Sequence, residues 1–377
     1  MSKRWVGCSI EQDYFGDDRK SGKVQRKLAT SKDRSKYKKT DLEKWQKKTQ
    51  LRESSKLDLD KYSRGRVLSI TPQGILVEKD GVTITCSLRG LLKKDKSQFK
   101  NLVTVGDFVL FEKSDGGEGQ IVQVEQRQTI LSRADNLSRR KEQLIAANID
   151  QVLITTSIVS PPLKPFLVDR YIIATCKGGM KPIIVVNKID LLLDERQDPL
   201  LIAQELEIYE EFLKAYQAVG IPVIAVSATT GEGMDELREA MKDKASVFSG
   251  QSGVGKSSLI NAVAGLTLRV GEVVGRTQKG SHTTTTANLL QMPFGGWCID
   301  TPGIKSFGLW DLKKDEVEKY FSEIYAQGRS CKYPNCSHTN EKDCAVIAAV
   351  EEGMISALRF QSYQYLVYSM AREHQRR

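Results

Sequence analysis

The sequence predicts a multidomain protein with three folded parts: an N-terminal β-barrel of the OB type, a central α/β domain, and an α-rich C-terminal domain that binds a metal ion. Three observations support this prediction. Short alternating strands follow a Lys-rich start, apolar strands then alternate with helices around a glycine-rich loop, and three cysteines and a histidine cluster near the end. We assign residues 63–132, 133–310 and 311–377 to these parts, after a basic extension over residues 1–62.

Composition limits the class of protein. The 377 residues contain no apolar run long enough to span a bilayer, and the first residues are too charged for a secretory signal. Seven cysteines, an odd number spread over a long chain, do not resemble a disulfide framework. We therefore expect a soluble cytoplasmic protein that has no membrane partner and is a monomer.

The positive charge is concentrated in the N-terminal extension. Residues 19–66 contain eighteen Lys or Arg against six Asp or Glu, whereas the net charge of the whole chain is +10. Such a segment buries too little apolar surface to order itself, so we expect disorder or a marginal helix over residues 41–51. A basic arm suits RNA phosphates, because binding releases counterions, and we favour this interpretation over a solvated tail.

Five short strands with regular turn signals follow the extension. Turn-forming residues such as those at 72–74, 79–81 and 115–117 separate them. Five strands with this punctuation favour an OB-type barrel, which often binds nucleic acid but can also be purely structural. The expected strands are 66–70, 74–77, 82–86, 107–111 and 119–124.

The pattern changes after a second basic segment, a connector over residues 130–145. Apolar runs without alternation are typical of strands buried on both faces of a parallel sheet, and helical segments separate them. The expected strands are 149–154, 182–186, 222–226, 245–248 and 297–299. The expected helices are 166–176, 200–219, 234–242 and 258–263.

A phosphate-binding loop lies in this domain. Residues 250–257 have the form G-x-x-x-x-G-K-S between an expected strand and an expected helix. Glycines let backbone N–H groups turn toward an anion, and the helix N-terminus adds its positive dipole end. Lys256 can reach the β- and γ-phosphates, and the Ser257 hydroxyl can bind Mg²⁺.

A guanine-reading motif precedes the loop. Asn187-Lys188-Ile189-Asp190 follows an expected strand, and an aspartate there can accept hydrogen bonds from N1–H and the 2-amino group of guanine but not from adenine. Ser227 and Ala228, at the end of the next strand, can offer a backbone N–H to the guanine O6. The expected GTP-binding residues are Asn187, Lys188, Asp190, Ser227, Ala228, Gly250, Gln251, Ser252, Gly253, Val254, Gly255, Lys256, Ser257, Ser258, Asp300 and Gly303.

Two further segments complete this site. Asp300-Thr301-Pro302-Gly303 closes a strand, so Asp300 can hold Mg²⁺ through water and the Gly303 N–H can meet the γ-phosphate. The loop 271–286 contains Thr284 and Thr283, and either can complete the Mg²⁺ shell, Thr284 being preferred. The base motif comes before the phosphate motif, the reverse of an ordinary GTPase. A circular permutation accommodates this order, because every motif stays at one sheet edge.

The C-terminal cluster predicts a structural zinc site. Cys331-x₄-Cys336-x-His338-x₅-Cys344 offers three sulfurs and one nitrogen, which suit one tetrahedral Zn²⁺. Unrelated buried cysteines are the alternative, and Asp343 is a weaker ligand candidate. Residues 345–370 are expected to form a helix.

Taken together, residues 63–366 resemble the circularly permuted GTPases that act on the small ribosomal subunit, the RsgA (YjeQ) family. The barrel, the permuted order, His282-Thr283-Thr284-Thr285 and the Cys/His signature carry the resemblance. It implies GTP hydrolysis to GDP, stimulated by the small subunit and serving its late maturation, and contact of the zinc module with ribosomal RNA.

Catalysis requires a group to orient water, and Ile304, after the Asp-x-x-Gly segment, cannot do so. His282 is the polar candidate in the switch loop, and the resemblance points to the same residue. It could instead only stabilise the loop.

The sequence leaves two alternative functions open. One is an RNA-binding scaffold that holds GTP or GDP with little turnover, and the other is an ATP-dependent enzyme. Stimulation of GTP turnover by small subunits would exclude the first.

Overall fold

The computed structural model describes residues 62–89, 101–113, 117–134, 142–193, 198–265, 287–300 and 314–375. The predictions for the basic extension before residue 62, including the helix over 41–51, lie outside the described residues, as do those for the loop 271–286. The domain boundaries remain predictions, and the one at 132–133 falls within a strand.

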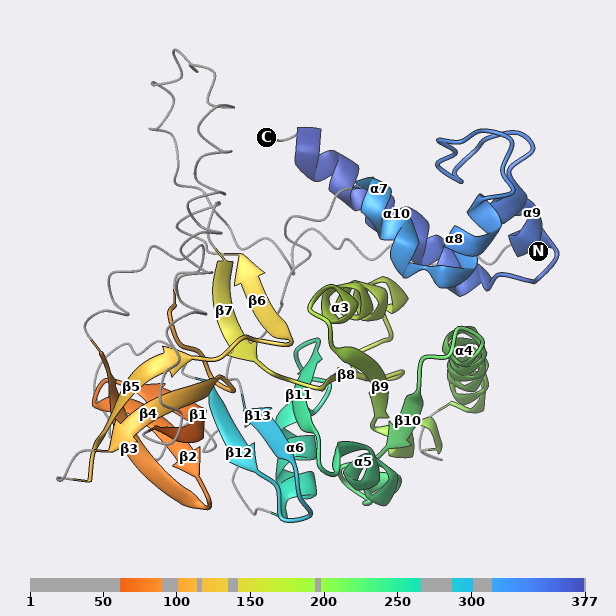
Figure 1. The fold of residues 1–377 in the computed structure, drawn as a ribbon. Helices are drawn as coiled ribbons and strands as arrows, with labels where there is room; N and C mark the ends of the chain where they lie inside the picture. The colour runs from red at the N-terminus through yellow and green to blue at the C-terminus, as the bar shows by residue number, and fades with distance from the viewer. Residues whose placement is uncertain are drawn as a thin grey trace, which may run out of the picture. The chain divides into compact units, whose positions relative to one another are not determined.

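The five barrel strands are where the alternating pattern places them. They form a closed ring in the order β1-β2-β3-β5-β4-β1, in which only the β3–β5 pair is parallel. Val67, Val77, Phe111 and Ile121 are fully buried inside it. The predicted barrel is therefore confirmed (Figure 1). Its strands are β1 (Ser63–Thr71), β2 (Gly74–Lys79), β3 (Val82–Leu88), β4 (Phe108–Lys113) and β5 (Gly119–Val124).

A mostly parallel sheet forms the centre of the α/β part. Its strand order is β10-β9-β8-β11-β13-β12, and only β12 runs antiparallel to its neighbour. β12 also pairs with β1 of the barrel through Asn288 and Ser69, so one hydrogen-bonded sheet joins both parts. The strands are β8 (Gln151–Thr156), β9 (Lys181–Asn187), β10 (Val223–Val226), β11 (Ala245–Gly250), β12 (Asn288–Gln291) and β13 (Trp297–Asp300).

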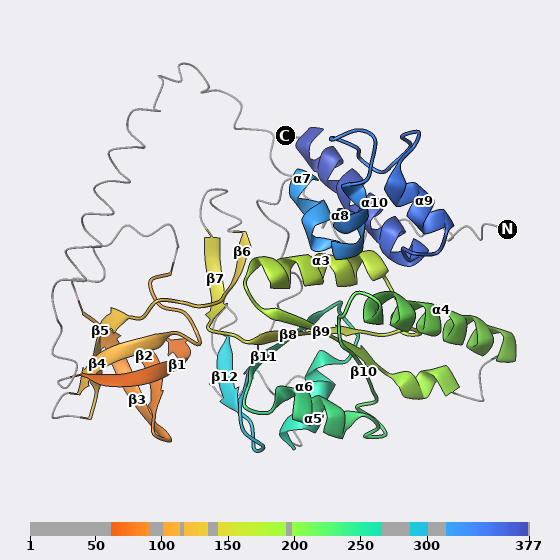
Figure 2. The same ribbon diagram turned by 45° about the vertical axis from the view of Figure 1, so that its right-hand side comes forward.

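Helices cover both faces of this sheet, as the continuous apolar strands predict (Figure 2). Val152 and Ile154 of β8 pack with α3 (Pro165–Lys177) and α4 (Pro199–Gln217). Leu153, between them, points to the other face, where it packs with α5 (Met234–Met241) and α6 (Lys256–Ala264). The α/β prediction is confirmed.

The C-terminal part is α-rich and packs on α3. Its core contains Phe321, Val346 and Tyr363, and Ile173 of α3 belongs to the same cluster. The long helix expected over residues 345–370 is wrong, because the chain breaks at Gly353, whose φ of 75° ends the first helix. The elements are α7 (Lys314–Val317), the 3₁₀ turn η4 (Glu318–Tyr320), α8 (Ser322–Gly328), α9 (Ala345–Glu351) and α10 (Ala357–Gln375).

Three of the described strands were not expected from the sequence. The basic connector contains an antiparallel pair, β6 (Ile130–Ala134) and β7 (Glu142–Ala147), whose Leu131 and Ala146 are buried in the main core. The short strand β12, which links the barrel to the sheet, was also missed.

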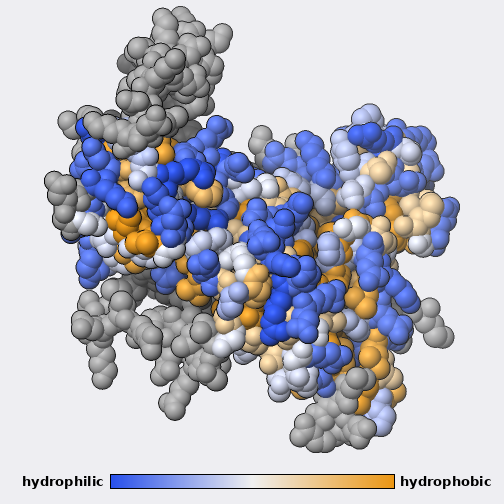
Figure 3. Space-filling model, turned by 60° about the horizontal axis from the view of Figure 1, so that its bottom comes forward, coloured by the Kyte–Doolittle hydropathy of each residue, from blue (hydrophilic) through white to orange (hydrophobic). Residues whose placement is uncertain are grey.

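Large hydrophobic side chains are exposed at a few described positions, among them Val82, Leu200 and Met354. Figure 3 shows small hydrophobic groups between larger hydrophilic areas, an ordinary pattern for a protein surface. No described helix combines the length and apolar character needed to cross a membrane.

Candidate nucleotide site and metal centre

The predicted phosphate loop lies at the end of a fully buried central strand. β11 is flanked by β8 and β13, and its last residue, Gly250, has a φ of 146°. A Cβ on Gly250 would lie 2.0 Å from the carbonyl oxygen of Thr155, and one on Gly255 would lie 2.4 Å from Asn187 Nδ2. The Thr155 backbone thus explains Gly250. A φ of 90° together with the Asn187 side chain explains Gly255, after which α6 begins directly with N–H groups that lack helical partners.

Lys256 lies folded over the loop. Its Nζ donates to the carbonyl oxygens of Gly250, at 2.9 Å, and Gln251, at 2.7 Å. Burial lowers the pKa of Lys256 to about 8, because the charged ammonium loses solvation. Val254 is buried, whereas Ser252, Gly253 and Ser257 are exposed. The ammonium is therefore available where an anion could approach the helix N-terminus.

Asn187 connects the base motif to the phosphate loop. This residue, at the end of β9, is 2% exposed. Its Nδ2 donates to the carbonyl oxygen of Val254 at 2.8 Å, and its Oδ1 accepts from the Ala228 amide at 3.2 Å. The structure thus brings three segments together that are far apart in the sequence.

Lys188 adds a second contact between the same segments. It has a φ of 67°, and its Nζ donates to the carbonyl oxygens of Ser160 and Gly253, both at 2.7 Å. The loop after β8 that contains Ser160 was not expected in the site from the sequence. It lies there because β8 separates β9 from β11 in the sheet.

Asp190 carries an unpaired buried oxygen. Asp190 lies in the 3₁₀ turn η3 (Ile189–Leu193), and its Oδ1 is buried without a hydrogen-bond partner among the described residues. Leaving such an oxygen unpaired is costly, so the carboxylate fits a ligand that brings N–H donors.

The amides of Ser227 and Ala228 are both engaged. The Ser227 amide donates to the carbonyl oxygen of Glu232, and the Ser227 hydroxyl accepts from the amides of Thr229 and Thr230. Ser227 therefore shapes this loop, while the Ala228 amide contacts Asn187 at the longer distance of 3.2 Å. Of these two amides, that of Ala228 is the better candidate to donate to the guanine O6.

The remaining predicted residues are only partly described. Asp300 ends β13, which is parallel to β11, so its backbone lies at the same sheet edge as the phosphate loop. His282, Thr283, Thr284 and Gly303 lie outside the described residues. Their roles remain predictions.

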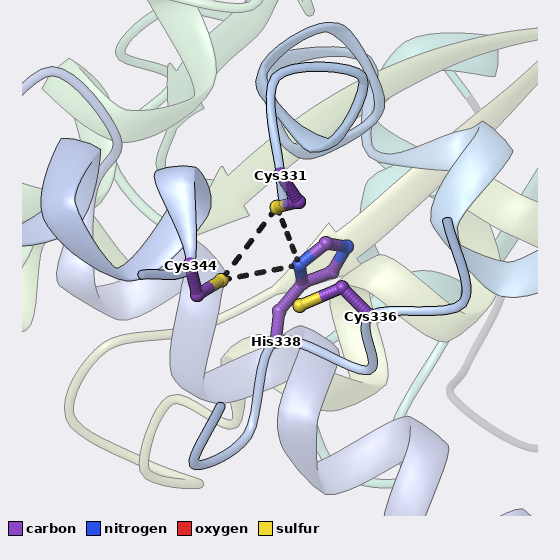
Figure 4. A group of neighbouring side chains, drawn as sticks. All are labelled: Cys331, Cys336, His338 and Cys344. Atoms are coloured by element: carbon purple, nitrogen blue, oxygen red, sulfur yellow. Dashed lines mark hydrogen bonds between the residues drawn. The ribbon is translucent and has the colours of Figure 1, made fainter. Parts of the chain in front are cut away.

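The four predicted zinc ligands come together in the C-terminal part. Their ligand atoms all lie within 4.8 Å of one another. His338 Nδ1 is 3.6 Å from Cys331 Sγ and 3.4 Å from Cys344 Sγ, and the two sulfurs are 3.8 Å apart. Figure 4 shows the side chains, with Cys336 on the remaining side, pointing toward a common centre.

These distances fit a tetrahedral ion and no disulfide. Sulfurs bound at about 2.3 Å to one tetrahedral zinc are separated by about 3.8 Å, whereas a disulfide needs about 2.05 Å. Burial and the neighbouring thiols raise the pKa of Cys336, which a bound cation would reverse. Asp343 is not in the cluster, since its carboxylate pairs with Lys332 Nζ at 2.9 Å on the surface.

Similar proteins identify the family. Residues 124–310 match the family model described as RsgA GTPase. The chain is 41% identical over 318 residues to the small ribosomal subunit biogenesis GTPase RsgA of Chlorobaculum tepidum, an alignment that covers 81% of this chain and 98% of that protein. The chain belongs to the RsgA GTPase family. The RsgA protein of Bacteroides fragilis is 37% identical over 287 residues, covering 75% of this chain and 89% of that protein.

Solved structures agree with this family assignment. YjeQ from Thermotoga maritima has a TM-score of 0.65 at 30% identity, covering 82% of this chain and 99% of that one. YloQ, described as a circularly permuted GTPase, has a TM-score of 0.63 at 25% identity, covering 83% and 96%. The chain is thus a GTP-hydrolysing enzyme with a permuted P-loop domain, as its motif order predicts.

Proposed function

We propose that this RsgA-family GTPase hydrolyses GTP to GDP and phosphate during late maturation of the small ribosomal subunit, and that this subunit stimulates turnover. The contact of Asn187 with both Val254 and Ala228 supports a single guanine nucleotide site. The assignment of the small subunit is supported by the relatives, which are named small ribosomal subunit biogenesis GTPases. A cytoplasmic monomer that contacts ribosomal RNA through its barrel, basic extension and C-terminal module fits this role.

Within that site we assign the roles as follows. Lys256 and the amides of the loop bind the β- and γ-phosphates, and Asp190 accepts from the guanine edge. Ser257, Asp300 and Thr284, or Thr283 in place of Thr284, hold Mg²⁺, which neutralises phosphate charge when bound. His282 orients the attacking water.

We assign one structural Zn²⁺ to Cys331, Cys336, His338 and Cys344. Three thiols and an imidazole leave no open position on a tetrahedral ion, so zinc there stabilises the fold and performs no chemistry. The ion would hold α9 and the loop before it to the end of α8.

Nucleotide affinity is expected to fall at high pH. The free site holds Lys256 with a pKa of about 8, and a bound phosphate raises that pKa because it favours the charged form. Binding therefore takes up a proton above about pH 8, and affinity for GDP should decrease by up to about tenfold per pH unit. Calorimetric titration from pH 7 to 9.5 measures this, and a flat profile would contradict it.

Turnover in the presence of ribosomal subunits tests the proposed function. Phosphate release is measured under multiple turnover while purified small or large subunits are titrated in parallel. The proposal requires stimulation by the small subunit and little by the large one. Equal effects of both subunits, or none, would refute it.

A further inference from the structure

The imidazole of His338 presents its two nitrogens to different environments. Nδ1 faces the sulfurs of Cys331 and Cys344. Nε2, on the other side of the ring, is buried and has no hydrogen-bond partner within normal distance in the part of the chain that the structure describes, and His338 as a whole is 1% exposed. The zinc assignment accounts for Nδ1 and leaves Nε2 unexplained.

A single carboxylate lies opposite Nε2. Glu318 Oε2, from the turn η4, is 3.6 Å from His338 Nε2, slightly beyond hydrogen-bond length. The carboxylate is partly exposed, with a side-chain exposure of 27%, whereas the His338 side chain is at 2%. A charge-assisted hydrogen bond of about 2.8 Å requires the two atoms to approach by about 0.8 Å.

Gly328 makes room for this pair. A Cβ on Gly328 would lie 2.7 Å from Glu318 Oε1 and 3.3 Å from both Cε1 and Nε2 of His338. The end of α8 therefore passes directly against the carboxylate and the ring. Any side chain at this position would push the two groups apart.

The tautomer of His338 determines how this pair interacts when an ion is bound. An imidazole that coordinates through Nδ1 must carry its proton on Nε2, and burying that N–H without an acceptor is costly. Metal-binding histidines accordingly donate their second N–H to a carboxylate or carbonyl, which fixes the tautomer and makes the ligand more basic. Glu318 is the carboxylate in position to do this.

We infer that Glu318 is a positioning residue of the metal centre, whose carboxylate accepts the Nε2–H of His338 and fixes Nδ1 as the metal ligand. This inference rests on the zinc site proposed above. It extends the centre beyond its four ligands to the segment of α7 and η4, so loss of Glu318 weakens metal binding without removing a ligand.

Zinc affinity of the full-length chain tests this role. Affinity is measured by competition with a chromophoric chelator for the wild type, Glu318→Ala, Glu318→Gln and the control Glu352→Gln, which removes an exposed charge from the same part. We expect about a 10- to 100-fold loss for Glu318→Ala, a smaller loss for Glu318→Gln, whose amide oxygen can still accept, and no change for the control.

A second readout reports the proton itself. The chain has three histidines, so ¹⁵N spectra of the zinc-loaded protein can resolve the imidazole of His338. The wild type should show Nδ1 coordinated and a slowly exchanging Nε2–H, and both Glu318 variants should exchange this proton faster. A purely structural effect of Glu318 would lower stability without changing that exchange.

The outcomes separate the inference from the zinc assignment. A wild type that binds no stoichiometric zinc refutes the metal site itself. A wild type that binds one zinc, with Glu318 variants equal to it in affinity and proton exchange, refutes the role of Glu318 alone. If Glu318→Ala does not fold, the comparison of Glu318→Gln with Glu352→Gln decides.

Discussion

Replacing Lys256 by Ala is expected to reduce GTP hydrolysis by about 10²- to 10³-fold, the usual cost of removing one group that stabilises transition-state charge. The ammonium of Lys256 is held on the phosphate loop by the carbonyl oxygens of Gly250 and Gln251. Without it, negative charge that develops on the transferred phosphoryl group loses its nearest positive partner. Phosphate release at saturating GTP measures the effect on kcat separately from KM.

The matched control for this experiment is Lys242→Ala. Lys242 follows α5 in the same domain and forms an exposed pair with Glu239 at 3.8 Å, a kind of contact that contributes little. Its variant should keep wild-type turnover. Circular dichroism checks that Lys256→Ala is folded, because the lysine also ties two loop carbonyls. Turnover of folded Lys256→Ala within about threefold of wild type would rule out its role in the phosphate site.

The second large effect concerns stability. Arg359 of α10 is 2% exposed and forms ion pairs with Asp169 of α3 and with Glu323 of α8, the latter at 2.8 Å. Its guanidinium also lies over the ring of Phe321, 4.5 Å from the ring centroid. Arg359 thus joins the C-terminal part to the helix that covers the GTPase sheet.

Removing this guanidinium should be severely destabilising. Arg359→Met leaves the Asp169 carboxylate, itself 1% exposed, without its cation, and breaking a buried pair in this way costs about 3–5 kcal/mol. We expect the free energy of unfolding to fall by this amount in the transition that includes the C-terminal part. Denaturant titration measures this transition. Adding Asp169→Asn to Arg359→Met should recover part of the lost free energy, because the buried charge is removed as well.

Arg238→Met provides the matched control. Arg238 of α5 is half-buried, pairs with the exposed Asp235 and donates to the carbonyl oxygen of Ala262 at 3.1 Å, so its removal should cost about 1–2 kcal/mol, less than breaking a buried pair. If Arg359→Met were no more destabilising than Arg238→Met, the buried network would not be what holds α10 to α3.

Much of this architecture follows from local sequence signals. The strand before the phosphate loop is predictable because residues 245–250 are small or apolar and lead into glycines. The barrel is predictable because polar and apolar residues alternate between turn signals. By contrast, β6 and β7 lie beside a run of basic residues that masks the strand signal, although Leu131, Leu144 and Ala146 are buried. The break at Gly353 was missed because apolar residues continue on both sides of it.

Contacts in the site that depend on the order of strands in the sheet could not be predicted from the sequence. Asn187 is predictable as part of the base motif, but its bond to Val254 requires β9 and β11 to be separated only by β8. The contact between Lys188 and Ser160 has the same origin. Likewise, the spacing of the cysteines predicts a metal site and does not reveal Glu318, which precedes the first ligand in the chain and approaches His338 only in the fold.

One site is proposed to read guanine with Asp190 and to hold phosphates with Lys256. The most direct test is the dissociation constant of Asp190→Asn for GTP and for xanthosine triphosphate, whose base presents an oxygen in place of the 2-amino group. The wild type should prefer GTP and Asp190→Asn should prefer xanthosine triphosphate, since the amide can donate to that oxygen. Unchanged preference for GTP in the variant would contradict this proposal.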